Sequence, residues 1–277
     1  NNNDKSREVT FGRGNLSFTS INLPRLGLKH RGDVPGFMEE LRSMVELVFD
    51  QLDERFELQC SRLARNYPFL MKQGVWLDSG TLKDTDEVRP VLRHGTLTVG
   101  FIGLAECLVA LIGSHHGESP MAQRIGLDIV RTIRTMADER GQKTGLNYTV
   151  IATPAEGLAG RFVLKDRALF GSIEGITDRD YYTNSFHVPV YFPITAAKKI
   201  SIEAPYHAMT NGGHISYVEV DGNPLNKSGG VGYDFAYAPR WPGRESRTGE
   251  YNEPGAGALR IEAGCLPFRS STIVHCV

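Results

Sequence analysis

The chain has 277 residues, of which 40% are hydrophobic and 23% are charged, a composition that is ordinary for a globular protein with a sizeable core. Its formal net charge of −1 gives no overall field that would attract nucleic acid or an anionic membrane surface, so we expect neither partner. The longest apolar run, from Val99 to Gly113, is interrupted by Glu106 and is too short to span a bilayer.

A short strand and a long helix are the first predicted elements. The strand covers Phe18 to Leu23, where β-branched residues are followed by a proline. Asp33 can cap the helix, and Pro35 is tolerated in its first turn. We expect the helix to end at Tyr67-Pro68, because the residue before a proline avoids the helical conformation. Its apolar residues recur at helical spacing: Phe37, Leu41, Met44, Val48, Leu52 and Phe56.

A second strand and two more helices follow a polar, irregular segment from Gln73 to Arg93. The pattern predicts a buried strand at Thr96 to Ile102 and an apolar helix at Gly103 to Leu111. Ser119 is the predicted cap of the next helix, and Gly141 is its predicted stop, because it follows a basic residue at the end of the helical pattern. The apolar stripe of that helix comprises Met121, Ile125, Ile129, Ile133 and Met136.

Three more strands are predicted further along the chain. Asn147 to Ala152 is rich in β-forming residues, and a helix then runs from Thr153 to about Phe170. His187 to Phe192 is a fourth strand candidate, and Thr195 to Met209 is expected to be helical in part. His214 to Val220 is the fifth predicted strand.

Strands that alternate with helices imply parallel pairing with right-handed crossovers. The expected fold class is therefore α/β, in the form of an α/β barrel or a piece of one. The segment from Asn226 to Val277 has no sustained apolar period, which favours either a disordered tail or a translation in the wrong frame. We expect two regions: a barrel domain at 1–222 and an irregular or disordered tail at 223–277.

The cysteines indicate a reducing compartment. Cys60, Cys107, Cys265 and Cys276 contain no Cys-x-x-Cys pair and are too few for a disulfide framework. Cys60 and Cys107 fall in apolar helical patterns, where we expect buried, reduced thiols. The first residues, Asn1 to Lys5, precede no apolar core of the kind found in a signal peptide, so we expect a cytoplasmic location.

Two short motifs suggest a ligand site. In Gly12-Arg13-Gly14-Asn15, the glycines permit close approach of a ligand, and Asn15 could hydrogen-bond a substrate hydroxyl. The alternative is a turn in which Asn15 bonds its own backbone.

Thr153 to Leu158 lies where a strand ends and a helix begins, and backbone N–H groups and the helix dipole bind phosphates at such places. The candidate substrate-binding residues there are Thr153, Ala155, Glu156 and Gly157. Alternatively, the Glu156 carboxylate caps the helix and competes with an anion.

Two further clusters favour structural interpretations. His115-His116-Gly117-Glu118 contains metal-ligand residue types, but adjacent side chains point in different directions, so a polar loop that starts a helix is favoured. Asp178 to His187 is typical of a binding loop, or of a loop held by salt bridges and tyrosine hydroxyls. His187 is expected to be a structural histidine. The sequence contains no recognisable nucleophile–base set, P-loop or dinucleotide fingerprint.

Taken together, several segments of the chain resemble the anaerobic (class III) ribonucleoside-triphosphate reductases, a glycyl-radical family. The resemblance extends roughly from Asp4 to Gly222. It rests on the following stretches, which occur in the family's order: Gly12 to Leu26, Gly100 to Glu106, His115 to Ser119, Ala152 to Leu158, Tyr181 to Val190 and Ala204 to Val220.

The resemblance implies about half of a ten-stranded α/β barrel and the radical reduction of ribonucleoside triphosphates to deoxyribonucleoside triphosphates, commonly with formate as the reductant. It implies a glycyl radical, an iron–sulfur S-adenosylmethionine-dependent activase, a structural zinc site and a homodimer when full length. It also implies that a fingertip-loop cysteine carries a thiyl radical. By resemblance, Asn15 falls on the family's active-site asparagine beside the ribose, and Thr153 to Gly157 falls where the substrate's phosphates meet a helix start.

The sequence departs from the family's pattern near both ends. The fingertip cysteine is expected shortly before Gly12, yet no cysteine precedes Cys60. The family's zinc-binding cysteines and radical glycine are absent, and Cys265 and Cys276 lack the zinc spacing. Val231-Gly232-Tyr233 fits a turn before the zinc site better than it fits the radical loop. We therefore expect a reductase fragment that is inactive alone.

Two alternatives to an inactive reductase fragment remain. The first is a non-catalytic nucleotide-binding or assembly piece that needs a partner chain, since half a barrel leaves unpaired strands. The second is a different glycyl-radical enzyme, such as a relative of the formate lyases. The segments at Asn15 and at Thr153 to Gly157 argue against this second alternative.

Overall fold

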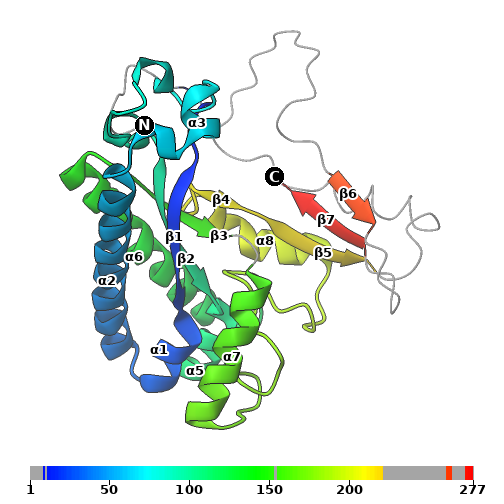
Figure 1. Cartoon of the computed structure of the whole chain (residues 1–277). Coiled ribbons are helices and arrows are strands. Elements are labelled where there is room, and N and C mark those ends of the chain that lie inside the picture. Colours follow the sequence, from blue (N-terminus) through cyan, green and yellow to red (C-terminus); the bar gives the residue numbers. More distant parts are fainter. Residues whose placement is uncertain (1–8, 10, 153–154, 221–259, 264–271, 277) are drawn as a thin grey trace.

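The computed structural model describes residues 9, 11–152, 155–220, 260–263 and 272–276 (Figure 1). Its main sheet has four parallel strands in the order β1-β2-β3-β4. These strands are β1 (Asn15–Asn22), β2 (Thr96–Ile102), β3 (Asn147–Ala152) and the short β4 (Gly213–His214). The bounds of β2 and β3 agree with the predicted strands, and the parallel pairing confirms the expected α/β class.

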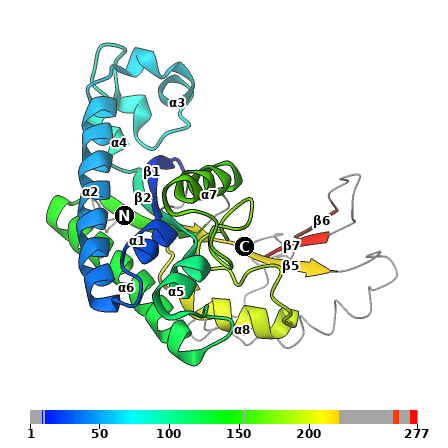
Figure 2. The same cartoon turned by 90° about the horizontal axis from the view of Figure 1, so that it is seen from below.

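Two long helices, α2 (Val34–Cys60) and α6 (Pro120–Thr144), cover one face of this sheet, and α7 (Glu156–Phe170) lies on the other side (Figure 2). Buried side chains of β2 and β3 point toward the two long helices and form the main core with them. Leu97, Val99 and Val150 are among these core residues, and each is at most 1% exposed. The burial of this apolar face fixes the helices against the sheet.

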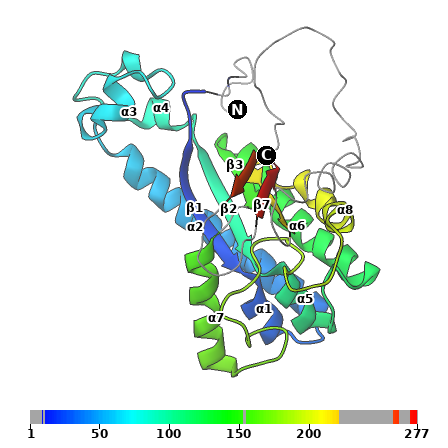
Figure 3. The ribbon, with the colours of Figure 1, turned by 90° about the vertical axis from the view of Figure 1, so that its right-hand side faces the viewer.

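The shorter helices before α6 gather at the two ends of the strands (Figure 3). The short elements η1 (Ala64–Asn66), α3 (Pro68–Lys72), η2 (Ser79–Thr81) and α4 (Arg89–Leu92) lie near the beginnings of β1 and β2. At the other end, α1 (Leu23–Lys29) packs closely on α5 (Leu104–Ile112). Gly27 allows this approach, because a Cβ atom there would lie 2.9 Å from the carbonyl oxygen of Cys107.

Both predicted caps of the two long helices are confirmed, but the predicted ends of these two helices are wrong. Asp33 Oδ1 accepts from Gly36 N at 3.0 Å, and Ser119 Oγ accepts from Met121 N at 3.2 Å. The first long helix ends at Cys60, well before Tyr67-Pro68. The next residues instead pair with a distant segment: Ala64 N donates to the carbonyl oxygen of Asp86 at 2.9 Å.

The predicted stop of α6 at Gly141 is also wrong. Gly141 is buried inside the helix, which continues to Thr144. Gly145 ends the helix in the left-handed conformation with φ 72°, and its N–H donates to the carbonyl oxygen of Gly141 at 2.9 Å. This conformation costs glycine little, because glycine has no Cβ.

The later strand predictions are partly wrong. The structure has no strand from His187 to Phe192, because Pro189 cannot donate to a ladder and Val188 N donates to the side chain of Glu203 at 3.0 Å. The helix predicted at Thr195 to Met209 is confirmed as α8 (Ala196–His207).

The predicted strand from His214 to Val220 is divided between two sheets. Its start belongs to β4, whereas β5 (Ser216–Val220) pairs antiparallel with β7 (Thr272–Cys276), which also pairs with β6 (Arg260–Ala263). The strands β6 and β7 lie in the region predicted to be an irregular tail. Apart from them, residues 223–277 lie outside the described part of the chain.

Side chains of α2 reach the outer edge of β1, the first strand of the main sheet. Arg55 Nη1 donates to the carbonyl oxygen of Phe18 at 3.1 Å and to the hydroxyl of Thr19 at 3.0 Å. Gln59 Nε2 donates to the carbonyl oxygen of Leu16 at 3.2 Å. Within the described part of the chain, no helix combines the length and the apolar character that a membrane span requires.

Candidate functional site

A cavity of about 430 Å³ lies on the face of the main sheet that α2 and α6 leave uncovered. Its walls come from β1, β2, β3, the start of α7 and the loop before α8. The lining residues are Asn15, Phe18, Ser20, Gly100, Phe101, Ile102, Ile151, Ala155, Gly157, Leu158 and Ser185. The cavity therefore brings together segments that lie far apart in the sequence.

Asn15 lies at one end of the cavity and is the first residue of β1. Its Oδ1 accepts from the hydroxyl of Thr98 at 2.8 Å, and that hydroxyl also lies 2.9 Å from the hydroxyl of Thr149. Because the oxygen side of the amide is held by this chain of bonds, the Nδ2 group is the side that can donate to a ligand. Asn15 belongs to the strand itself, whereas the sequence predicted a turn before a strand beginning at Phe18.

The start of α7 lies at the other end of the cavity. Ala155 is the N-cap residue, and its side chain cannot accept a hydrogen bond from the first turn. Gly157 is exposed, and a Cβ atom there would meet nothing within 4 Å. Thr153 and the side chain of Glu156 lie outside the described residues, so the cap predicted for Glu156 cannot be compared with the structure.

The sequence motifs thus converge on one cavity, but they do not share one end of the strands. Asn15 pairs with Thr96 at the beginning of β2, whereas Ala155 follows the carboxyl end of β3. A ligand that touches both must lie along the sheet face. Ser20 and Gly100 line this path and were not singled out from the sequence. In a strand, alternate residues point to the same face of the sheet, so the sequence shows which residues share a face. It does not show which face carries the cavity until the face covered by the long helices is known.

The loop from Tyr182 to His187 is held by polar contacts, as one interpretation of this segment expects, and one of its residues lines the cavity. The Tyr182 hydroxyl donates to Asp166 Oδ2 at 2.9 Å. Ala155 N donates to Asn184 Oδ1 at 3.1 Å, which connects the loop to the start of α7. Ser185 lines the cavity directly.

His187 lies outside the cavity and is buried beside Glu203, with 3.4 Å between Nδ1 and Oε2. Burial opposes ionisation of Glu203, but contacts with His187 and Lys199 lower the pKa of its carboxyl to about 2. The buried pair agrees with the structural role predicted for His187.

The predicted loop at His115 to Glu118 is structural as well. His116 Nε2 lies 2.7 Å from the carbonyl oxygen of Phe186, and burial lowers the pKa of His116 to about 3. The neutral imidazole therefore donates to that carbonyl. Among the described residues, no group of three or more His, Cys, Asp or Glu side chains could hold a metal ion.

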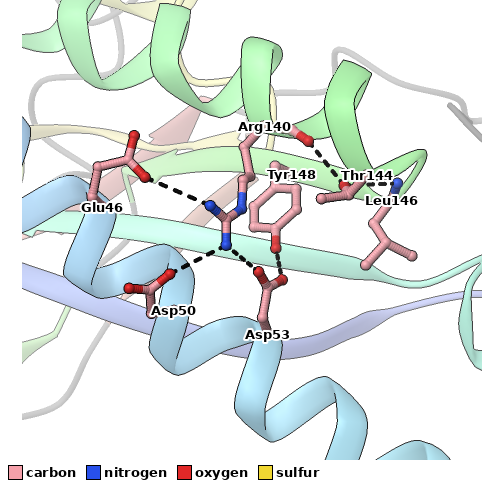
Figure 4. A network of polar contacts seen from close by, with 7 residues as sticks. All are labelled: Glu46, Asp50, Asp53, Arg140, Thr144, Leu146 and Tyr148. Carbon is pink, nitrogen blue, oxygen red and sulfur yellow. Dashed lines mark hydrogen bonds and ion pairs between the residues drawn. The ribbon is translucent and has the colours of Figure 1, made fainter.

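A second cavity, of about 610 Å³, lies near the beginnings of the strands between α2, α4 and the end of α6. Two of its charged side chains are paired with each other, because Arg89 donates to Glu57 at 2.9 and 2.6 Å. Another, Asp53, accepts from Arg140 and from the Tyr148 hydroxyl (Figure 4). These charges are therefore compensated by partners within the fold.

Both cysteines with described side chains are fully buried. Burial raises the pKa of the Cys60 thiol to about 11 and that of Cys107 well above its ordinary value of 9.0. Neither thiol lines the cavity that contains Asn15. The expectation of buried, reduced thiols is confirmed for these two residues.

The parallel sheet, with helices on one face and a cavity on the other, defines the class as an α/β domain. Residues 2–230 match the family model for the anaerobic ribonucleoside-triphosphate reductases. The chain therefore belongs to the anaerobic ribonucleoside-triphosphate reductase family, a family of enzymes.

Curated relatives are similar over most of the chain. The reductase of Salmonella typhimurium is 35% identical over 220 residues, which cover 78% of this chain and 31% of the relative. The reductase of Enterobacteria phage T4 is 34% identical over 231 residues, which cover 80% of this chain and 36% of the relative. The chain thus spans about a third of the length of these relatives.

Solved structures show the same fold. An anaerobic ribonucleotide reductase superimposes with a TM-score of 0.63 and 21% identity, covering 81% of this chain and 34% of the other. The Thermotoga maritima enzyme in complex with dATP and CTP superimposes with a TM-score of 0.61 and 21% identity, covering 80% of this chain and 35% of the other. The described sheet and helices therefore form part of the α/β barrel of these reductases, as expected.

Proposed function

We propose that this chain forms one wall of the substrate site of an anaerobic ribonucleoside-triphosphate reductase. In this proposal, the ribose of a ribonucleoside triphosphate lies near Asn15, and the phosphates lie at the start of α7. Thr153, Ala155, Glu156 and Gly157 bind those phosphates. The single observation that carries the proposal is the cavity that Asn15, Ala155 and Gly157 line together.

The start of α7 suits a phosphate group. The first backbone N–H groups of a helix have no partner within the helix, and the helix dipole favours an anion there. Ala155 has no capping side chain, and Gly157 adds no side chain that would keep an anion away. At the other end, the Nδ2 group of Asn15 can donate to a hydroxyl of the sugar.

The radical chemistry requires a cysteine that reaches the ligand and a radical glycine, in addition to the residues that line the cavity. Cys60 and Cys107 are buried away from the cavity, so neither can take a hydrogen atom from a ligand bound there. In the proposal, a cysteine and a radical glycine from the rest of a complete reductase supply this step. The glycyl radical, the activase, formate, the zinc site, the homodimer and the cytoplasmic location belong to the same proposal. We therefore expect no turnover by this chain alone.

A second candidate function is a non-catalytic nucleotide-binding or assembly piece that needs a partner chain. The observation that favours it is the uncovered sheet face, where Phe18 is 59% exposed. The two functions can be separated by mixing this chain with a chain that carries the missing parts and treating both with the activase. Deoxyribonucleotide formation supports the reductase fragment, whereas nucleotide binding without turnover supports the binding piece.

Nucleotide binding by the chain itself provides the first test. We expect calorimetric titration to show that CTP binds more tightly than cytidine. Gly157→Asp should weaken CTP binding about tenfold, because a carboxylate beside the phosphates would repel them. The fold should tolerate the change, since the site is open and an acidic residue suits the first turn of a helix.

Gly80→Asp is the matched control for Gly157→Asp. Gly80 is also exposed, has open space around its Cβ position and lies outside the cavity. It should leave CTP binding unchanged. Equal affinity of the Gly157→Asp variant and the unchanged chain for CTP would contradict the proposed phosphate position.

A further inference from the structure

Ser185 combines three properties that set it apart within the described residues. It lines the cavity, it is only 1% exposed, and its backbone has a φ of 46°. The one other described non-glycine residue with positive φ is Asp78, which lies outside this cavity. A serine in the left-handed region persists only where its surroundings enforce that conformation, and such residues cluster at ligand sites.

The start of α5 enforces the conformation of Ser185. Leu104 N donates to the carbonyl oxygen of Ser185 at 3.1 Å, and Gly103 N donates to that of Thr183 at 2.8 Å. Glu106 Oε1 accepts from the N–H of Thr183 at 2.9 Å and from its hydroxyl at 2.7 Å. The loop is therefore fixed on both sides of Asn184.

Asn184 places this loop beside the start of α7. Its Oδ1 accepts from Ala155 N at 3.1 Å, and its backbone forms an isolated bridge with Ile102 at the end of β2. Ser185 follows directly and contributes to the same wall of the cavity. The serine thus lies at the end of the cavity where Gly157 and the first turn of α7 are open.

We propose that Ser185 is a ligand-contact residue whose hydroxyl donates to a phosphate oxygen of the bound nucleotide. Glu106 is the positioning residue that holds the serine in place through Thr183. This inference rests on the proposed function, because it assigns a new contact to the same cavity. Glu106 itself does not line the cavity.

Two substitutions of Ser185 separate the hydroxyl from the backbone. Ser185→Ala removes the hydroxyl and keeps the Cβ atom, whereas Ser185→Gly also suits the left-handed backbone. We expect both variants to bind CTP about tenfold more weakly and to bind cytidine unchanged, because a donor to a charged oxygen is lost. The glycine variant should melt at a higher temperature than the alanine variant.

Asp78→Gly is the control, because it changes the other described left-handed residue outside the cavity. It should leave the affinity for CTP unchanged. Glu106→Gln keeps an oxygen that accepts from Thr183 and should bind CTP normally, whereas Glu106→Ala should lose affinity as Ser185→Ala does. Normal binding by Glu106→Gln together with weak binding by Glu106→Ala would show that the hydrogen bonds from Thr183 hold Ser185 in position.

The outcomes distinguish the two proposals. If the unchanged chain binds no nucleotide, the proposed function fails. If it binds CTP and both Ser185 variants bind equally well, the contact by Ser185 is overturned while the proposed function stands. If the Ser185 variants weaken CTP and cytidine to the same degree, the serine does not contact phosphate.

Discussion

Glu106 is a carboxyl group that the fold buries almost completely, at 3% exposure. Burial raises the pKa of Glu106 above its ordinary value of 4.5, although the two hydrogen bonds from Thr183 and the charge of Arg179 oppose the rise. The unfolded chain loses this proton near the ordinary value, while the folded chain retains it to higher pH. Unfolding therefore releases a proton in the interval between the two pKa values, and stability falls as pH rises through it.

Replacing Glu106 by glutamine should remove this pH dependence. Glutamine cannot ionise and still accepts from Thr183, so Glu106→Gln should gain stability relative to the unchanged chain as pH rises above about 4.5. Urea unfolding midpoints measured from pH 4.5 to pH 8 would reveal this widening difference. Glu139→Gln, at an exposed position on α6, should not show it. A difference that stays constant with pH would mean that Glu106 titrates normally in the folded chain.

At the scale of whole elements, Arg140 connects the two long helices to the sheet (Figure 4). From α6, its guanidinium forms ion pairs with Asp53, with Asp50 at 3.3 Å and with Glu46 at 3.6 Å, all on α2. Asp53 also accepts from the hydroxyl of Tyr148 on β3. The Arg140 side chain is 18% exposed, so it is better shielded than an ordinary surface pair.

Arg140→Met should lower the free energy of unfolding by about 1–3 kcal/mol, because it leaves the partly buried Asp53 without its cation. Arg131→Met is a matched control on the same helix. Arg131 pairs with Asp128, but both side chains are about 60% exposed, and such pairs contribute little. Chemical denaturation of both variants would test this difference. Equal effects of the two substitutions would show that Arg140 acts as a surface charge.

The best predicted elements are those whose first and last residues are set by neighbouring residues in the sequence. The strands β2 and β3 have buried apolar sequences with clear limits, and Asp33 and Ser119 cap helices through bonds within one turn. The predicted ends of the two long helices were wrong for other reasons. Residue 64 pairs with Asp86 across a long sequence separation. Near the end of α6, the sequence does not show whether Gly141 or Gly145 adopts the left-handed conformation.

The cavity was predictable in part for the same reason. Asn15 and Gly157 stand in recognisable local motifs, and the structure places both in its lining. Ser20 depends on which face of β1 the long helices cover, a property of the assembled sheet. Ser185 depends on a backbone conformation that the start of α5 enforces through Leu104 and Glu106. No local pattern encodes either dependence.

At the scale of the whole molecule, the main sheet of the described residues is covered on one face and carries the cavity on the other. Its outer strand on one side is β1. A strand edge with free carbonyl oxygens can pair with a strand of another molecule and so start aggregation. Arg55 and Gln59 occupy the carbonyl oxygens of Phe18 and Leu16 along this edge.

We expect Arg55→Ala to increase self-association, because it frees the carbonyl oxygen of Phe18 beside an exposed phenyl ring. Light scattering during concentration of the protein would measure the change. Arg42→Ala is the control, since Arg42 is exposed on the same helix and bonds to the carbonyl oxygen of Met38 within it. Unchanged scattering for Arg55→Ala would show that the edge is protected by other means. If scattering increases, α2 has two roles: it covers the core, and it protects the edge of β1 against amyloid-like growth.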